Sequence, residues 1–229
     1  MNHFFCEDIS DEIGFLNEQD SHHAIRVLRL KEGSKISVSP KNGKVYEAEI
    51  LKANKNELRF ACGELLREEK RPLVSIAIAP TKSNDRFEWF LEKATEFGIA
   101  NIYPILCANS ERKVYKTERG EKVIKAAAKQ SKKGFLPRLH QLQKIKSLVQ
   151  GHSQKQCFIA HLANGPKLIL NDINFQQDSL FLIGPEGDFS KAEVELALQA
   201  GFKAVSLGKE VLRTETAGMK IAAAADLLS

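Results

Sequence analysis

Two glycine-containing loops near the carboxyl end of the chain hold the residues best suited to bind a small molecule. The first loop, residues 184–188 (GPEGD), comes directly after the apolar run 181–183 (FLI). The second loop, residues 208–216, comes after the apolar run 204–207 (AVSL). Each apolar run is typical of a buried strand, and a helical pattern follows each loop. Because glycine lets a ligand approach the main chain closely, the loops predict a pocket made largely of backbone atoms.

The common nucleotide-binding and hydrolytic motifs do not occur in this sequence. It contains no GxxxxGK[ST] run and no GxGxxG after a predicted strand, which argues against a P-loop nucleotidase, a dinucleotide-binding fold and the common methyltransferase fold. GxSxG, HExxH and paired Cys/His sets are also missing. Residue chemistry alone therefore predicts a small-molecule pocket near residues 183–216 and does not name its ligand.

Three histidines have positions that could carry chemistry. His161 follows the apolar run 156–160, so it is a candidate catalytic residue at a strand end, although a lone histidine more often makes a structural hydrogen bond. His22 and His23 are adjacent, and adjacent side chains on a helix point about 100° apart. They do not form a two-ligand face, and we expect no metal site.

The elements that must position the loops alternate between strands and helices. Residues 85–97, 191 onward and 214 or 216 onward have helical spacing, and Ser190 with Glu193 matches a capping box. This alternation predicts a mainly parallel sheet with helices on its faces. The predicted strands are residues 73–79, 99–106, 156–160, 181–183 and 204–207.

The first part of the chain has a different pattern, with short alternating runs separated by turn residues. Asn42-Gly43 lies between the runs 35–39 and 45–51, which is a hairpin signal, and residues 58–62 form a third run. One helix is expected at residues 21–29. The pattern predicts a small β-barrel. The charged stretch 64–72 ends in proline, and we expect two domains there, residues 1–70 and 72–229.

Composition is that of a soluble globular protein. No apolar run has the length of a membrane helix, and the first residues (MNHFFCEDIS) do not resemble a signal peptide, so a cytoplasmic location is expected. The four cysteines, Cys6, Cys62, Cys107 and Cys157, are scattered, which favours reduced thiols over disulfides or a zinc site.

Positive charge is concentrated in the second part of the chain. The net charge is +5, yet residues 1–70 hold 11 Lys/Arg against 13 Asp/Glu. Nine basic residues lie between Arg112 and Lys133, opposed by two glutamates. Spacing of three and four places Lys122, Lys125, Lys129 and Lys132 on one helical face, and Val123, Ala127 and Ser131 on another, which we expect to be buried. A one-sided stripe favours an RNA contact over a merely solvated face.

Arg26, Arg29 and Lys31 lie on and just after the helix expected at residues 21–29. A solvated helix face and a nucleic-acid contact explain these three residues equally well.

Several motifs together resemble one known family. Residues 182–187 (LIGPEG), 207–208 (LG) and 211–217 (VLRTETA) are similar to the signature of the RsmE-type 16S rRNA (uracil-N3)-methyltransferases of the SPOUT superfamily. Other matches along the chain are His23 with residues 27–29, residues within 87–98, residues 110–112 (SER), and residues 128–131 (AKQS) before Pro137. Three positions depart from the family pattern: Asp188 stands where a second glycine is common, Lys129 where glutamate is often found, and Lys133 where arginine is frequent.

The resemblance implies an architecture and a ligand set. It implies an α/β fold, with an N-terminal PUA-like β-barrel that helps hold RNA and a C-terminal SPOUT-type domain with a deep trefoil knot. It also implies a homodimer that binds S-adenosylmethionine (SAM) and methylates N3 of one uridine in small-subunit rRNA. The implied cofactor-binding residues are His161, Leu162, Ile183, Gly184, Pro185, Glu186, Gly187, Leu207, Gly208, Val211, Leu212, Thr214, Thr216 and Ala217. The expected RNA-binding residues are Arg26, Arg29, Arg112, Lys113, Lys122, Lys125, Lys129, Gln130 and Lys133.

Methyl transfer to uridine N3 requires loss of a proton and leaves negative charge on the base. We expect Arg213 to stabilise that charge and Glu215 to accept the proton, directly or through water. The alternatives are that Arg213 binds an RNA phosphate or pairs with Glu186, and that Glu215 only favours the helix dipole.

Two other functions fit the same residues. A methyltransferase of the same fold could act on ribose 2′-O or on guanine, because the cofactor loops do not specify the target. A non-catalytic RNA-binding protein of ribosome assembly would use the basic stripe without binding SAM.

Overall fold

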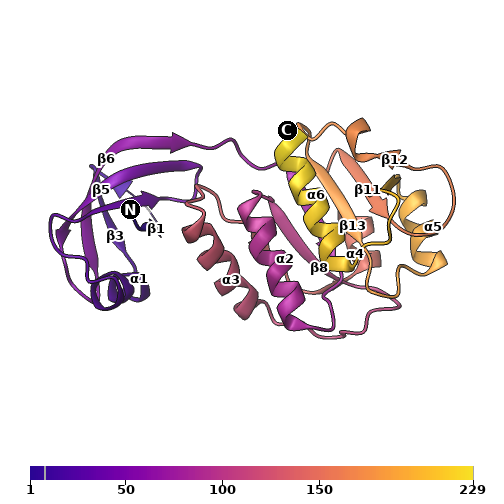
Figure 1. The fold of residues 1–229 in the computed structure, drawn as a ribbon, viewed down its shortest axis with the longest axis horizontal. Coiled ribbons are helices and arrows are strands. Elements are labelled where there is room, and N and C mark those ends of the chain that lie inside the picture. Colours follow the sequence, from indigo (N-terminus) through magenta and orange to yellow (C-terminus); the bar gives the residue numbers. More distant parts are fainter. Residues whose placement is uncertain (8, 229) are drawn as a thin grey trace. The chain divides into compact units, whose positions relative to one another are not determined.

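The computed structural model describes residues 1–7 and 9–228, and packing divides the chain into two units. The first holds the described residues of Met1–Arg71 together with Ala126–Leu136. The second holds Pro72–Lys125 and the described residues from Pro137 onward. Figure 1 identifies the elements of each unit along the chain.

A six-stranded sheet forms the first unit, with strand order β1-β4-β5-β6-β3-β2 in the described residues. β4 and β5 are the antiparallel hairpin predicted around Asn42-Gly43, and β1 pairs with β4 in parallel. Phe4, Ile36, Leu58 and Phe60 are fully buried between the curled strands. The strand bounds are β1 His3–Phe5, β2 Ile9–Ser10, β3 Ile13–Leu16, β4 Lys35–Ser39, β5 Lys44–Lys52 and β6 Leu58–Glu68.

The helix expected at residues 21–29 begins earlier than predicted and changes its winding. α1 spans Glu18–His22 and is followed by a π-helical turn, η1, at His23–Val27. The start is set by Asn17, whose side chain accepts a hydrogen bond of 2.9 Å from the Asp20 amide. The helix therefore starts at Glu18 rather than at residue 21, because Asn17 caps it upstream of the apolar pattern.

Residues 126–136, which were expected within the second domain, pack with the first unit. The carbonyl oxygen of Gly134 accepts hydrogen bonds from the Gly43 amide (3.0 Å) and from Ser39 Oγ (3.1 Å). The Gly134 amide donates to Glu69 Oε2 at 2.9 Å. A Cβ at Gly134 would lie 2.5 Å from the Gly43 carbonyl oxygen, so only glycine fits this backbone contact.

The second unit is built on a parallel sheet with strand order β10-β8-β7-β13-β11-β14-β12, and β9 pairs with β8. Every pairing in this sheet is parallel among the described residues, as the alternation of strands and helices predicted. β7 and β13 lie side by side although about a hundred residues separate them. The strand bounds are β7 Val74–Ile78, β8 Asn101–Leu106, β9 Arg138–Leu139, β10 Gln143–Lys144, β11 Gln156–Ala160, β12 Leu168–Ile169, β13 Ser179–Ile183 and β14 Lys203–Ser206.

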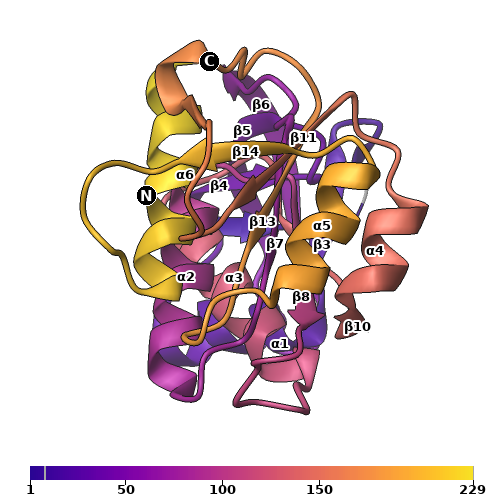
Figure 2. The ribbon, with the colours of Figure 1, turned by 90° about the vertical axis from the view of Figure 1, so that its right-hand side faces the viewer.

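Helices cover both faces of this sheet. Figure 2 shows α2 and α6 on one face and α4 and α5 on the other. Gly218 of α6 lies so close to α2 that an added Cβ would be 2.6 Å from the Phe90 ring. The helix bounds are α2 Asn84–Glu96, α3 Thr117–Gln130, α4 Ile145–Gly151, α5 Lys191–Gln199 and α6 Thr214–Leu228, with a short 3-10 turn, η2, at Leu170–Asp172.

Two details of the helices bear on the predictions. Ser190 and Glu193 form the predicted capping box at the start of α5. The buried face predicted around α3 was right for Ala127 and wrong for Val123 and Ser131: Ala127 is buried together with Ile124 and Ala128, whereas Val123 and Ser131 are half-exposed. The four cysteines form no disulfide with one another in the described structure. Within the described residues, no helix is long and apolar enough to cross a membrane.

Candidate functional site

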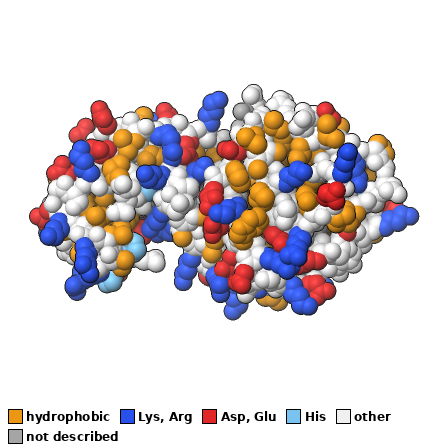
Figure 3. Space-filling view, in the orientation of Figure 1, with side chains coloured by type: hydrophobic (Ala, Val, Ile, Leu, Met, Phe, Trp, Pro, Cys, Tyr) orange, Lys and Arg blue, Asp and Glu red, His pale blue; other side chains and the backbone are white. Residues whose placement is uncertain are grey.

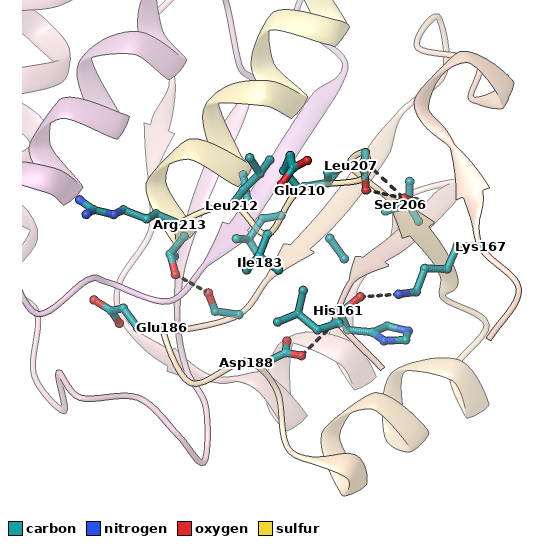
Figure 4. Close-up of a pocket in the computed structure, with 18 of the residues that line it drawn as sticks. His161, Lys167, Ile183, Glu186, Asp188, Ser206, Leu207, Glu210, Leu212 and Arg213 are labelled. Carbon is teal, nitrogen blue, oxygen red and sulfur yellow. Dashed lines mark hydrogen bonds between the residues drawn. The ribbon is translucent and has the colours of Figure 1, made fainter. Parts of the chain in front are cut away.

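A cavity of about 560 Å³ lies in the second unit at the carboxyl ends of three neighbouring strands, β11, β13 and β14. The sheet register explains why these ends meet. Ala160, the last residue of β11, pairs with Ile183, the last residue of β13, and with Val205 of β14. Loops that leave adjacent parallel strands at one edge enclose a common space, and Figure 4 shows their side chains around it. The cavity lies where the two glycine loops predicted a pocket.

Hydrogen bonds on both sides hold the first loop, residues 184–188. Thr214 Oγ1 at the start of α6 donates to the Gly184 carbonyl oxygen at 3.0 Å in a buried bond. On the other side, Asn109 Nδ2 donates to the carbonyl oxygens of Gly187 (3.0 Å) and Asp188 (3.1 Å). The loop is therefore a fixed wall rather than a free flap.

The second loop uses glycine for its conformation and apolar side chains for its surface. Gly208 has a φ of +124°, a region that other residues rarely adopt. Ser206 Oγ and the Gly208 backbone are hydrogen-bonded at 3.3 Å. Leu207 and Leu212 line the cavity together with Ile183, the last residue of β13. The enclosed space thus combines apolar walls with exposed main-chain groups, which suits a flat heterocycle and a ribose.

The loop after β11 places a histidine at the cavity. Both ring nitrogens of His161 are buried, and neither bonds to another group within residues 1–7 and 9–228. Burial lowers the pKa of His161, the nearby Lys167 lowers it further, and Asp188 opposes the shift. A neutral imidazole offers one donor and one acceptor to a ligand. Lys167 Nζ donates to the His161 carbonyl oxygen at 2.7 Å.

The cavity wall includes most of the residues predicted to hold a cofactor. Two predicted residues, Gly187 and Thr216, are not part of its lining in the described structure. The predicted residues that line it are His161, Leu162, Ile183, Gly184, Pro185, Glu186, Leu207, Gly208, Val211, Leu212, Thr214 and Ala217. Sequence reasoning did not select Lys167, Asp188, Val205, Ser206, Lys209 and Glu210 as cofactor residues, although they also line it. Only Asp188 had a local signal, since it directly follows the GPEG run.

The two candidate catalytic residues have different surroundings. Arg213 is exposed and lines the cavity, and it forms no ion pair with Glu186 or any other described residue. Glu186 Oε1 instead accepts a hydrogen bond of 3.0 Å from the Lys82 amide. Glu215 is 6% exposed, lies outside the cavity lining, and its Oε1 is 3.9 Å from Arg86 Nε. The geometry brings Arg213, but not Glu215, to the cavity.

The predicted RNA-binding residues of the second unit differ in solvent exposure and in the contacts of their side chains. Lys113 and Lys122 are exposed, and Lys125 is half-buried. The guanidinium of Arg112 is hydrogen-bonded to Asn84 and lies 5.7 Å from the centre of the Tyr115 ring.

Four of the predicted RNA-binding residues in the first unit have solvent-accessible side chains. Arg26, Arg29 and Gln130 are exposed, and Lys133 is half-buried. Lys129 is the exception, since its Nζ lies 2.5 Å from Oδ1 of the buried Asp20. Figure 3 shows Lys and Arg side chains interspersed with acidic ones on the face it presents.

Comparison with known proteins identifies the family. Residues 68–226 match the family described as "RNA methyltransferase domain", and residues 16–61 match "RNA methyltransferase PUA domain". The chain belongs to the RsmE-type family of RNA methyltransferases. The family predicted from the loop motifs is thereby confirmed, as is the fold class: a PUA-like N-terminal domain and a parallel α/β unit with helices on both faces.

Three relatives show how far the similarity of this family member extends. The "Ribosomal RNA small subunit methyltransferase E" of Bacillus subtilis is 27% identical over 214 residues, which cover 87% of this chain and 84% of the relative. A crystal structure described as a probable rRNA-methyltransferase from Porphyromonas gingivalis is 35% identical with a TM-score of 0.85, covering 97% and 96% of the two chains. A Legionella pneumophila methyltransferase, solved in complex with bound SAM, is 25% identical with a TM-score of 0.85, covering 98% and 96%.

Proposed function

We propose that this chain transfers a methyl group from SAM to N3 of a specific uridine in 16S rRNA. The observation that carries the proposal is the cavity at the ends of β11, β13 and β14 in a chain of the RsmE-type family. Relatives of this family carry the name of a small-subunit rRNA methyltransferase, and one similar structure was solved with SAM bound.

The cavity residues suit the parts of SAM. A volume of about 560 Å³ falls in the usual range for small-molecule sites. Ile183, Leu207 and Leu212 offer apolar surfaces to an adenine, while the backbone at Gly184 and Gly208 allows close approach. When bound, SAM supplies a methyl group on a positively charged sulfonium. Gly187 supports the wall through the contact of its carbonyl oxygen with Asn109, and a contact from Thr216 stays a prediction.

Arg213 is the residue we assign to the chemistry of the base. Its guanidinium is exposed at the cavity and free of an internal ion pair among the described residues. It can therefore stabilise the negative charge that develops on the uracil oxygens when N3 loses its proton. Proton acceptance by Glu215 stays a prediction. Its burial and its proximity to Arg86 favour a supporting role, in which it orients Arg86 beside the start of α6.

RNA binding is assigned to both units. The proposed contacts are Arg26, Arg29, Gln130 and Lys133 in the first unit, and Arg112, Lys113, Lys122 and Lys125 in the second. Lys129 belongs to the proposed set only through its position beside Gln130, because its ammonium is already engaged by Asp20. Exposed lysines and arginines bind phosphates by charge and need no single geometry.

A deep trefoil knot, a homodimer and a cytoplasmic location are further parts of the proposal. Support for the knot comes from α6, which follows β14 yet packs on β7 and β13 in the middle of the sheet. The chain must therefore cross back over the strand ends after β14. Support for a dimer comes from apolar side chains left in solvent on α2 and α6, namely Trp89, Leu227 and Leu228.

Mass spectrometry of 16S rRNA nucleosides from cells lacking this protein tests the reaction. We expect loss of 3-methyluridine and its return when the wild-type chain is supplied. Persistence of 3-methyluridine with loss of a 2′-O-methyl or methylguanine nucleoside would identify a different target for the same fold. Calorimetry that detects no SAM binding to the purified chain would favour the non-catalytic RNA-binding function.

A further inference from the structure

Asp188 occupies a backbone conformation that glycine adopts more easily. Its φ is +57°, and its amide donates to the Pro185 carbonyl oxygen at 2.9 Å, so residues 185–188 form a tight turn. An aspartate in this conformation costs more energy than a glycine would. A contact made by the side chain can offset that cost.

The carboxylate of Asp188 reaches from the loop after β13 to the loop after β11. Its Oδ2 accepts a hydrogen bond of 2.9 Å from the Leu162 amide. A dashed line at Asp188 marks this bond in Figure 4. No donor in the described part of the chain bonds to Oδ1. Because Asp188 lines the cavity, this bond holds a carboxylate with an unused oxygen at the cavity wall.

The carboxylate of Asp188 determines the net charge of the side chains that line the cavity. Among the described residues, three cations line the cavity, Lys167, Lys209 and Arg213, and three acids line it as well, Glu186, Asp188 and Glu210. His161 does not add to the cations at neutral pH, because burial lowers its pKa below the ordinary value. The lining is therefore formally balanced, and removal of the Asp188 charge would leave it positive.

We propose that Asp188 makes the site prefer the positively charged methyl donor over the neutral product of transfer. The inference rests on the proposed function, which makes SAM the donor and S-adenosylhomocysteine (SAH) the product. The two molecules differ by one methyl group and one positive charge. A fixed carboxylate in a partly enclosed cavity attracts the charged donor and contributes little to the neutral product. Product release is thereby favoured after each turnover.

The variant Asp188→Asn removes the negative charge of the side chain while keeping the conformation of the loop. Asparagine also tolerates a positive φ, and its side-chain oxygen can still accept the hydrogen bond from the Leu162 amide. Equilibrium binding of SAM and of SAH is measured for wild type and D188N by calorimetry at low and high salt. We expect SAM affinity to fall about five- to tenfold and SAH affinity to change less than twofold, with the larger difference at low salt.

Two further variants serve as controls. Asp188→Gly removes both the charge and the acceptor, so we expect it to weaken SAH as well as SAM. Glu210→Gln removes a charge from the same cavity on an exposed residue, where solvent screens it, so its effect on the SAM/SAH ratio should be smaller than that of D188N.

The measurements test the role of Asp188 separately from the proposed methyltransferase function. An unchanged SAM/SAH ratio in D188N would overturn the role of Asp188, as would an equal change in E210Q. Failure of the wild-type chain to bind either molecule would instead contradict the proposed function.

Discussion

Thr214 Oγ1 donates a buried hydrogen bond of 3.0 Å to the carbonyl oxygen of Gly184, joining the first residue of α6 to the loop after β13. Thirty residues separate the two groups in the chain. The bond ties together the two glycine loops that enclose the cavity, so the position of one loop depends on the other. Through this bond, a change at the start of α6 can shift the position of the first loop.

Replacing Thr214 with valine should loosen this wall. Valine has nearly the same shape but no hydroxyl, so the Gly184 carbonyl oxygen loses a buried donor, at a cost of about 1–3 kcal/mol. We expect reduced thermal stability and a SAM affinity lower by about tenfold. Calorimetry and thermal unfolding measure both. Thr214→Ser keeps the hydroxyl and serves as the matched control, and a loss in T214S as large as that in T214V would show that the hydroxyl hydrogen bond is not what holds the wall.

Arg213→Ala should abolish methylation while leaving SAM binding largely intact. The exposed guanidinium has no internal ion pair to lose within the described residues, so folding should not suffer. We expect a fall in kcat of about a hundredfold or more, the size of effect known for groups that stabilise a developing negative charge. Single-turnover methylation of rRNA and SAM calorimetry on the same preparation separate chemistry from binding. Near-normal turnover in R213A would remove Arg213 from the mechanism.

Lys129 and Lys122 should behave differently although sequence reasoning placed both in the RNA-binding set. Lys129 pairs with Asp20, which is 2% exposed, so Lys129→Ala leaves a buried carboxylate without its cation. We expect a loss of stability of about 2–4 kcal/mol. Lys122 is exposed, so Lys122→Ala should weaken RNA binding and leave unfolding unchanged.

Chemical denaturation and filter binding of an rRNA fragment, applied to both variants, provide the comparison. The double variant Asp20→Asn with Lys129→Ala should recover stability, because no buried charge remains. A K129A chain as stable as wild type would mean that the ion pair contributes nothing.

His3 should make the stability of the chain depend on pH. Burial lowers the pKa of His3 from 6.5 to about 4, against the opposing effect of its hydrogen bond with the Lys133 carbonyl oxygen. Between pH 6.5 and about 4, His3 is therefore mostly protonated in the unfolded chain and mostly neutral in the folded chain. Stability is complete above pH 6.5 and falls as the pH drops toward 4, by about 2 kcal/mol between pH 7 and pH 5.

Urea unfolding of wild type and His3→Gln at pH 7 and pH 5 tests this. Glutamine can also donate to the Lys133 carbonyl oxygen but does not titrate, so the variant should show a smaller loss on acidification. A wild-type loss equal to that of H3Q would assign the pH dependence to other groups.

Local patterns were sufficient to place the main elements and the outline of the cavity. The capping box at Ser190, the hairpin at Asn42-Gly43 and the apolar runs that became β11, β13 and β14 all depend on neighbours within a few residues. The short strands β1, β2 and β3 were missed, because they have only two to four residues each. Such strands are defined by their partners in the sheet rather than by their own periodicity.

Contacts between distant residues decided the rest. Glu215 lies beside Arg86 on another helix, Lys129 lies beside Asp20, and Asp188 bonds the Leu162 amide. The spacing of residues within the chain cannot reveal such pairs, because each joins segments that only the fold brings together. By itself the sequence determined the two glycine loops, the alternation that makes a parallel sheet and the motifs of the family. Only the tertiary structure decided which charges line the cavity, because the register of β11, β13 and β14 brings their three loops to one edge.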